Sequence, residues 1–346
     1  MRALPASISP CICLTVIVDR LLLVSNDTAE AYAALQAGVL ELCGAQLLQS
    51  DSVAVLKAAA LLVHALASQH DQAVRALTHS VLTPPNTVIP RLIALIRGAS
   101  NTGGHVEVTV LEAVLLALGS LCGGTNGSIA SEPDERAGTT QMQRTMSQMF
   151  ASDVSAISSL IALAAGTHAS SRGASPATSA AALRLIEELS HEASVGHALL
   201  NAGALRPIVA VMQQSSSHER ECDLVAMKAF GALCKHAEPS TELLMGIDLI
   251  VRRFAAGVSA GVGRVSETLH PSSFLSMSAS VSRAAEVLET CMVHAQCCRV
   301  IAERGSAALI ELLLEMEVRR AHTSNKQARP LDPVRLSLFC LVHSDT

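Results

Sequence analysis

The chain has 346 residues, half of them hydrophobic and 16% charged, so it is able to bury a large core and lacks the composition of a disordered protein. Aromatic residues make up only 2%, and a core built from Leu, Ala, Val and Ile favours packed helices over a β-sandwich. The net charge of −5, without a long basic run, excludes the usual electrostatic footprint of a nucleic-acid or anionic-membrane binder.

Residues 1–27 form an apolar N-terminal segment in which the run "PCICLTVIV" is similar to the hydrophobic part of a signal peptide. Asp19 and Arg20 interrupt this run before it reaches the length of a membrane span. We therefore interpret the segment as a partial repeat or a cap. The ten cysteines include no C-x-x-C pair, which is typical of thiols in a reducing compartment and predicts a cytoplasmic protein.

From residue 28 onward, short helical patterns end at a turn, and a second apolar pattern with helical spacing follows each turn. The stretch "HALLNAGALRPIVAVMQ" is the clearest case: Gly203 suits a left-handed helix end, and Pro207 suits the first turn of the next helix. Six second helices are predicted, with starts near Gly38, Thr87, Asp153, Gly203, Gly246 and Gly305.

A third pattern, small-x-x-x-apolar-x-x-apolar, follows each of these helices. Its members are Ala59/Val63/Leu66, Val114/Leu118/Leu121, Ala182/Ile186/Leu189, Ala226/Phe230/Leu233, Ala284/Leu288/Cys291 and Val334/Leu338/Leu341. Polar segments rich in Gly, Ser or Pro interrupt the series and are predicted to be inserted loops near 123–145, 166–178, 258–280 and 319–330.

A short helix, a turn and two longer antiparallel helices resemble the armadillo repeat. The resemblance implies an all-α, armadillo-like right-handed superhelix of about six repeats over residues 28–346, whose third helices line a concave face that holds a protein partner. Peptide-binding members of the family carry a ladder of Trp and Asn there. The matching positions here contain neither: they are Leu61 and Ala65, Leu116 and Ser120, Arg184 and Glu188, Lys228 and Ala232, Glu286 and Thr290, and Leu336 and Cys340.

We accordingly predict a non-catalytic adaptor or scaffold that binds protein and uses no cofactor, nucleic acid or membrane. The candidate partner-binding residues are Arg184, Glu188, Lys228 and Glu286, although solvated surface charges would produce the same pattern. A regulator resembling the armadillo nucleotide exchange factors of chaperones, which embrace a globular domain, is the alternative within this family.

The strongest candidate for a metal site is "CMVHAQCC", in which Cys291, His294 and Cys298 fall on one helical face. Structural zinc normally takes four ligands, so we predict packing against a neighbouring repeat and no metal. A metal- or thiol-dependent enzyme is the alternative from another class. The two histidines of "HEASVGH" are six apart rather than four, and no G-x-S-x-G motif occurs, so we predict no catalytic residue.

Apolar helical patterns lie close to both ends, in "CICLTVIVDRLLLV" and "RLSLFCLVHSDT". A helical array needs polar outer faces on its terminal units. We expect the isolated chain either to self-associate through a terminus or to be one piece of a longer array.

Overall fold

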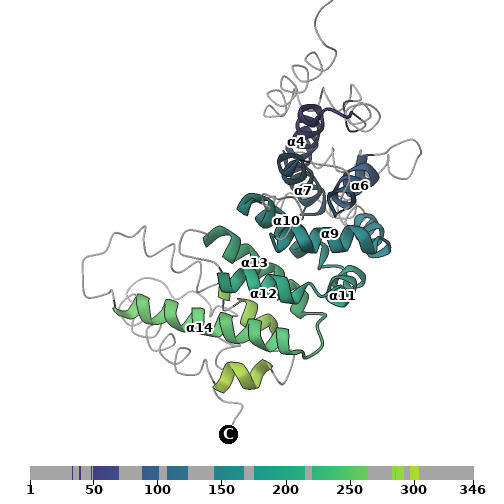
Figure 1. Cartoon of the computed structure of the whole chain (residues 1–346). Coiled ribbons are helices and arrows are strands. Elements are labelled where there is room, and N and C mark those ends of the chain that lie inside the picture. The colour runs from purple at the N-terminus through teal and green to yellow at the C-terminus, as the bar shows by residue number, and fades with distance from the viewer. Residues whose placement is uncertain are drawn as a thin grey trace, which may run out of the picture. The chain divides into compact units, whose positions relative to one another are not determined.

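The computed structural model describes residues 33, 39, 48, 50–69, 88–100, 107–123, 144–166, 175–214, 220–263, 283–284, 286–291 and 297–303. Within these residues the regular structure is helical, without a strand, as the composition predicts. The chain divides into two compact units, Met1–Ala204 and Leu205–Thr346 (Figure 1).

The first unit stacks its helices in two layers. The third-helix patterns form one layer, in which α4 packs on α7 and α7 packs on α10; α6 and α9 pack together in the other. The bounds are α4 Val53–Gln69, α6 Val88–Ser100, α7 Val108–Gly123, α9 Val154–Ala164, α10 Pro176–Leu189 and α11 Ala193–Asn201, with a further helix at Arg144–Ser152. This layering is what stacked repeats require, because each helix pair buries its apolar face against the next pair.

The predicted anchors of the third helices form the core. All fifteen that lie in described residues are buried, from Ala59, Val63 and Leu66 in α4 to Ala284, Leu288 and Cys291 in the second unit. Four of the five described sets begin with alanine, whose small side chain suits a close approach of neighbouring helices, and the fifth begins with Val114. The last set, Val334/Leu338/Leu341, lies outside the described residues.

Polar caps and one glycine define the helix ends around the predicted turns. Asp153 caps α9 by accepting a hydrogen bond from the backbone N–H of Ala156 at 3.0 Å, and Ser175 caps α10 in the same way through Thr178 at 3.1 Å. The predicted start at Asp153 is therefore confirmed. The chain bends by 98° between Arg144–Ser152 and α9 without any glycine, because the Asp153 side chain satisfies the first turn.

Gly203 ends α11 as the sequence predicts. Its φ of 80° is in the left-handed region, and its N–H donates to the carbonyl of Leu200 at 2.9 Å. The next N–H, of Ala204, donates to the carbonyl of Leu199 at 3.0 Å, which completes the Schellman arrangement.

The second unit contains α12 Leu205–Gln214, α13 Arg220–Cys234 and α14 Thr241–Gly263, followed by helical residues 286–291 and 297–303. α12 packs on both α13 and α14. The apolar positions expected in α12, Leu205, Ile208, Val209 and Met212, are all buried.

The predicted turn at Gly246 is wrong, because α14 runs through it without a break. A Cβ atom at Gly246 would overlap the ring of the buried Phe230 and would lie 3.1 Å from Cγ2 of Val209. Gly246 therefore serves close packing of α14 against α12 and α13, and no turn is needed because the Ser240 hydroxyl caps one long helix.

Three of the predicted loops are shorter than expected. Helix α10 already begins at Pro176, inside the loop predicted at 166–178, because Ser175 and Pro176 form a cap with proline at the first helical position. Helix α14 extends to Gly263, into the loop predicted at 258–280. In the loop predicted at 123–145, Gly123 and residues 144 and 145 are helical. Several predicted features lie outside the described residues: the loop segments 124–143, 167–174 and 264–280, the loop at 319–330, and the turns at Gly38 and Gly305. Helix α6 begins at Val88, directly after the predicted start at Thr87.

Candidate functional site

The surface that the third helices of the first unit leave uncovered is narrow. Along α7, residues 110–122 are buried except for a stripe at Glu112, Leu116, Gly119 and Ser120, because helices pack on its other sides. The stripes of the two neighbouring helices continue this surface. We call the combined surface the third-helix face; it consists of Leu61, His64 and Ala65 on α4, Glu112, Leu116, Gly119 and Ser120 on α7, and Arg184, Glu187 and Glu188 on α10.

The part of this face over α4 and α7 holds one polar contact. Nδ1 of His64 lies 2.6 Å from Oγ of Ser120, so the two side chains share a hydrogen bond between adjacent repeats. Burial lowers the pKa of His64, and a hydrogen bond with the backbone of Leu116 partly opposes that shift. His64 is therefore a neutral polar group near pH 7.

The charged part of the face lies on α10, where the predicted residues Arg184 and Glu188 are one helical turn apart. Arg184 is exposed and Glu188 is half-buried. Burial raises the pKa of the Cys122 thiol on α7, and the Glu188 carboxylate raises it further.

The other two predicted residues belong to the second unit. Lys228 is half-buried on α13, and Glu286 is exposed and forms an ion pair with Arg283 at 2.6 Å. Such an exposed pair stabilises a helix only weakly. Neither observation tests the predicted role in partner binding, which stays a prediction for all four residues.

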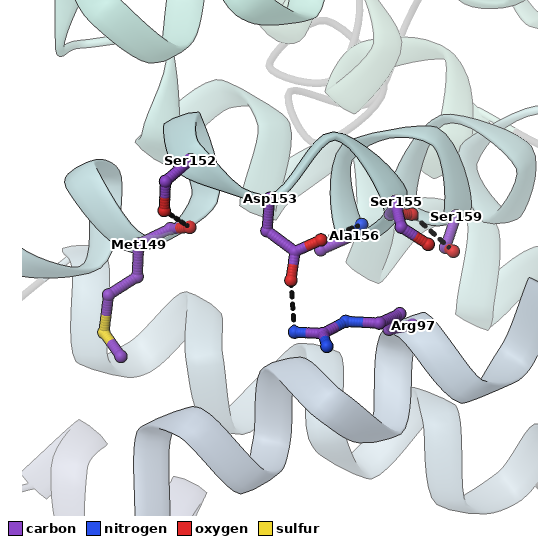
Figure 2. Close-up of polar contacts among 7 residues, drawn as sticks. All are labelled: Arg97, Met149, Ser152, Asp153, Ser155, Ala156 and Ser159. Carbon is purple, nitrogen blue, oxygen red and sulfur yellow. Dashed lines mark hydrogen bonds and ion pairs between the residues drawn. The ribbon is translucent and has the colours of Figure 1, made fainter.

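A polar contact joins α6 to the bend at Asp153, and Figure 2 shows it. The guanidinium of Arg97 points at one carboxylate oxygen of Asp153, while the other oxygen caps α9 through Ala156. The neighbouring hydroxyls of Ser152 and Ser159 donate to backbone carbonyls of their own helices (Figure 2). This arrangement positions the second-helix layer and holds the bend.

In the second unit, Arg253 of α14 has a similar structural role. Its guanidinium pairs with Asp223 of α13 and donates to the backbone carbonyl of Met212 in α12. Burial lowers the pKa of Arg253, although an arginine stays charged at neutral pH. One side chain thus joins three helices.

The described cysteines are free thiols, and all of them except the half-buried Cys298 are packed in the core. Cys234 and Cys291 share a side-chain hydrogen bond, and burial raises the pKa of Cys234. Burial also raises the pKa of Cys297, to about 11. Low thiolate content makes such groups poor nucleophiles at neutral pH.

Only two of the three residues of the predicted metal candidate lie in the described part of the chain. Cys291 is buried and Cys298 is half-buried, whereas His294 lies outside the described residues. Within the described part of the chain, no three His, Cys, Asp or Glu side chains are arranged to hold a metal ion. In the described part of the chain, no single helix has the length and hydrophobicity of a membrane span, whereas two bent helix pairs reach them only when each pair is taken together.

Sequence reasoning missed Gly119, His64 and Arg253. An isolated glycine inside a helical pattern is a recognisable signal, and Gly119 lies two residues before the anchor Leu121. The pairing of His64 with Ser120, 56 residues away, and of Arg253 with Asp223, 30 residues away, depends on how the helices stack and has no local signal.

No protein-family model matches the chain, and no curated protein matches it. The chain is similar in structure to a designed armadillo repeat protein, with a TM-score of 0.51 and 17% identity over 82% of this chain and 95% of the other. It is also similar to computationally designed armadillo repeat proteins for modular peptide recognition, with a TM-score of 0.50 and 15% identity over 80% of this chain and 92% of the other. Together with the helical layers, these similarities show an all-α, armadillo-like repeat fold.

Proposed function

We propose that the chain is a non-catalytic adaptor or scaffold that binds a protein partner along the third-helix face. The observation that carries the proposal is the continuity of this face: its stripes cross α4, α7 and α10 in succession, and these helices pack side by side. Stacked helical repeats generally present such extended surfaces to other polypeptides. The designed armadillo proteins described as made for peptide recognition support the same class of function.

Two further points belong to the proposal. Within the second unit, we include Lys228 and Glu286 in the proposal, because they occupy the equivalent register of their own helices and are half-buried and exposed, respectively. The working compartment is the cytoplasm, which the free thiols of the described cysteines support because a reducing compartment keeps thiols reduced. Cell fractionation with a membrane and a secreted marker tests the compartment.

Site-specific photocrosslinking in the native cell tests the proposal directly. A photoreactive residue replaces Leu61 or Leu116 on the third-helix face, or the exposed Ser158 on α9 as the control. We expect the two face positions to crosslink to a shared protein partner and Ser158 to remain without it. The proposal fails if the face positions give no protein adduct, or if Ser158 gives the same adducts.

A further inference from the structure

Gly119 lies within α7 at a position that the chain's own packing leaves open. A Cβ atom built there would meet no described atom within 4 Å. The two glycines of the second unit differ, since a Cβ at Gly231 would lie 3.1 Å from Val287 and one at Gly246 would overlap Phe230. Gly231 and Gly246 are thus explained by the fold, and Gly119 is not.

A glycine inside a helix is unfavourable because it loses more conformational freedom on folding than alanine does. Since no described neighbour occupies the space above Gly119, the missing side chain leaves a low point on the third-helix face. Such a low point allows a side chain or backbone from another molecule to approach α7 closely. Gly119 therefore points to a partner that is seated there.

The surroundings of Gly119 indicate what kind of segment fits. Leu61, Ala65 and Leu116 offer no side-chain hydrogen-bonding group, and His64 and Ser120 are hydrogen-bonded to each other. An extended segment would leave its own backbone N–H and C=O groups poorly paired against this surface, which is costly. A helix satisfies its backbone groups internally and needs only an apolar side to fit.

The charge on α10 indicates which side chains accompany the apolar ones. Arg184 contributes +1, and Glu187 and Glu188 contribute −2, so this end of the face carries a net charge of −1. A basic residue on the partner helix complements it. Packed helices lie about 8–10 Å apart and a helix rises about 1.5 Å per residue, so contacts with successive third helices recur about every five to seven residues.

We propose that the third-helix face binds one amphipathic helix of a protein partner, which crosses α4, α7 and α10. Its apolar residues, about five to seven apart, lie over Leu61 and Leu116 and fill the space above Gly119, and its basic end lies over Glu187 and Glu188. The inference rests on the proposed function and specifies the chemistry of the partner segment.

The test uses the purified full chain and two displayed peptide libraries. One contains amphipathic helices of about 21 residues, long enough at about 1.5 Å per residue to cross three packed helices. The other contains extended peptides with regularly spaced prolines. We expect the helical library to yield binders with apolar residues about five to seven apart and Lys or Arg at one end. Enrichment of the extended library alone, or of neither library, overturns the inference.

The selected helix is then measured against matched variants by fluorescence anisotropy. Gly119→Leu should weaken binding by about tenfold or more, because it fills the site, while its melting temperature stays equal to or above that of the original chain. Ser158→Leu places the same side chain on α9 and should leave binding unchanged. The double substitution Glu187→Gln and Glu188→Gln should weaken binding and reduce its salt dependence.

Binding that is unaffected by Gly119→Leu, or weakened equally by Ser158→Leu, overturns the inference. These outcomes are separable from failure of the proposed function. Crosslinks at Leu61 and Leu116 together with unaffected binding to Gly119→Leu mean that the face binds protein in another way. Loss of the crosslinks removes both proposals.

Discussion

Gly203 is the residue whose backbone conformation most directly determines a helix end. Its φ of 80° is unfavourable for a β-branched residue, while open space surrounds the position where a Cβ would lie. We expect Gly203→Val to lower the free energy of unfolding by about 1–3 kcal/mol through backbone strain alone. Urea unfolding followed by circular dichroism measures the change.

Gly203→Asn is the matched control, because asparagine adopts the left-handed region more readily than valine does. We expect it to lose clearly less stability. Equal losses in the two variants would contradict an explanation by backbone strain.

His64 makes stability depend on pH in a predictable direction. Its pKa in the folded chain is below the ordinary value of 6.5, mainly because of burial, so the unfolded chain binds the proton more readily. The contribution of His64 is therefore complete above about pH 6.5 and is lost as the pH falls toward the lowered folded pKa. Melting curves between about pH 8 and pH 5 should show a larger loss in the original chain than in His64→Asn. Parallel curves for the two proteins would rule out this effect.

At the scale of whole elements, Gly246 is expected to control how closely α14 packs on α13. A Cβ there would overlap the ring of Phe230, which is fully buried and would have to shift against its own neighbours. Gly246→Ala should therefore destabilise the second unit by about 1–3 kcal/mol, despite the better helix propensity of alanine. Thermal unfolding of the variant and the original chain measures this loss of stability. Gly231→Ala, whose Cβ would lie 3.1 Å from Val287, should cost less; the reverse order would contradict the packing.

The ion pair between Arg253 and Asp223 also acts between elements. Asp223→Ala removes the carboxylate partner of a partly buried guanidinium and leaves its hydrogen bond to the Met212 carbonyl, so we expect a loss of about 1–2 kcal/mol. Arg252 provides the comparison, because its side chain is 68% exposed although it also pairs with a partly buried carboxylate, that of Asp248. Arg252→Ala should cost less than about 0.5 kcal/mol in the same denaturant titration. Similar costs for both would indicate that the connection to α12 and α13 does not matter.

At the scale of the whole molecule, the two compact units predict that damage stays local. Stability in repeat proteins is approximately a sum of unit stabilities and nearest-neighbour terms. We expect Gly246→Ala to speed amide hydrogen exchange in α13 and α14 and to leave α4 and α7 at their original rates. Hydrogen exchange followed by mass spectrometry resolves these segments. A uniform acceleration along the chain would show that it unfolds as a single unit.

Much of the fold follows from local chemistry that a sequence displays. The anchors Ala182, Ile186 and Leu189 are spaced for one helical face, and the cap at Asp153 and the turn at Gly203 depend on neighbouring residues only. Gly246 misled the prediction because glycine suits both a helix end and a close helix crossing. Sequence spacing alone cannot decide between the two, since the deciding atom belongs to Phe230 on another helix.

For the third-helix face, the sequence predicts only which positions of successive repeats are equivalent. The pattern placed Leu116, Ser120, Arg184 and Glu188 at equivalent positions of their repeats, and the structure brings the helices that carry them side by side. The sequence pattern did not indicate that His64 forms a hydrogen bond with Ser120, or that the space above Gly119 is open. Both depend on the distance and rotation between stacked helices, which small differences in side-chain volume determine.

The sequence by itself determined the class of structure: an apolar repeat at 3.6-residue spacing, with turns and small residues at regular places, produces stacked helices and no sheet. Only the tertiary structure decided which glycine is a helix end and which a packing contact, and which polar side chains meet. The physical reason is the distance along the chain over which each interaction acts. Helix formation and capping act within a few residues of the chain, whereas close packing and buried hydrogen bonds depend on atoms that the fold brings together from distant segments.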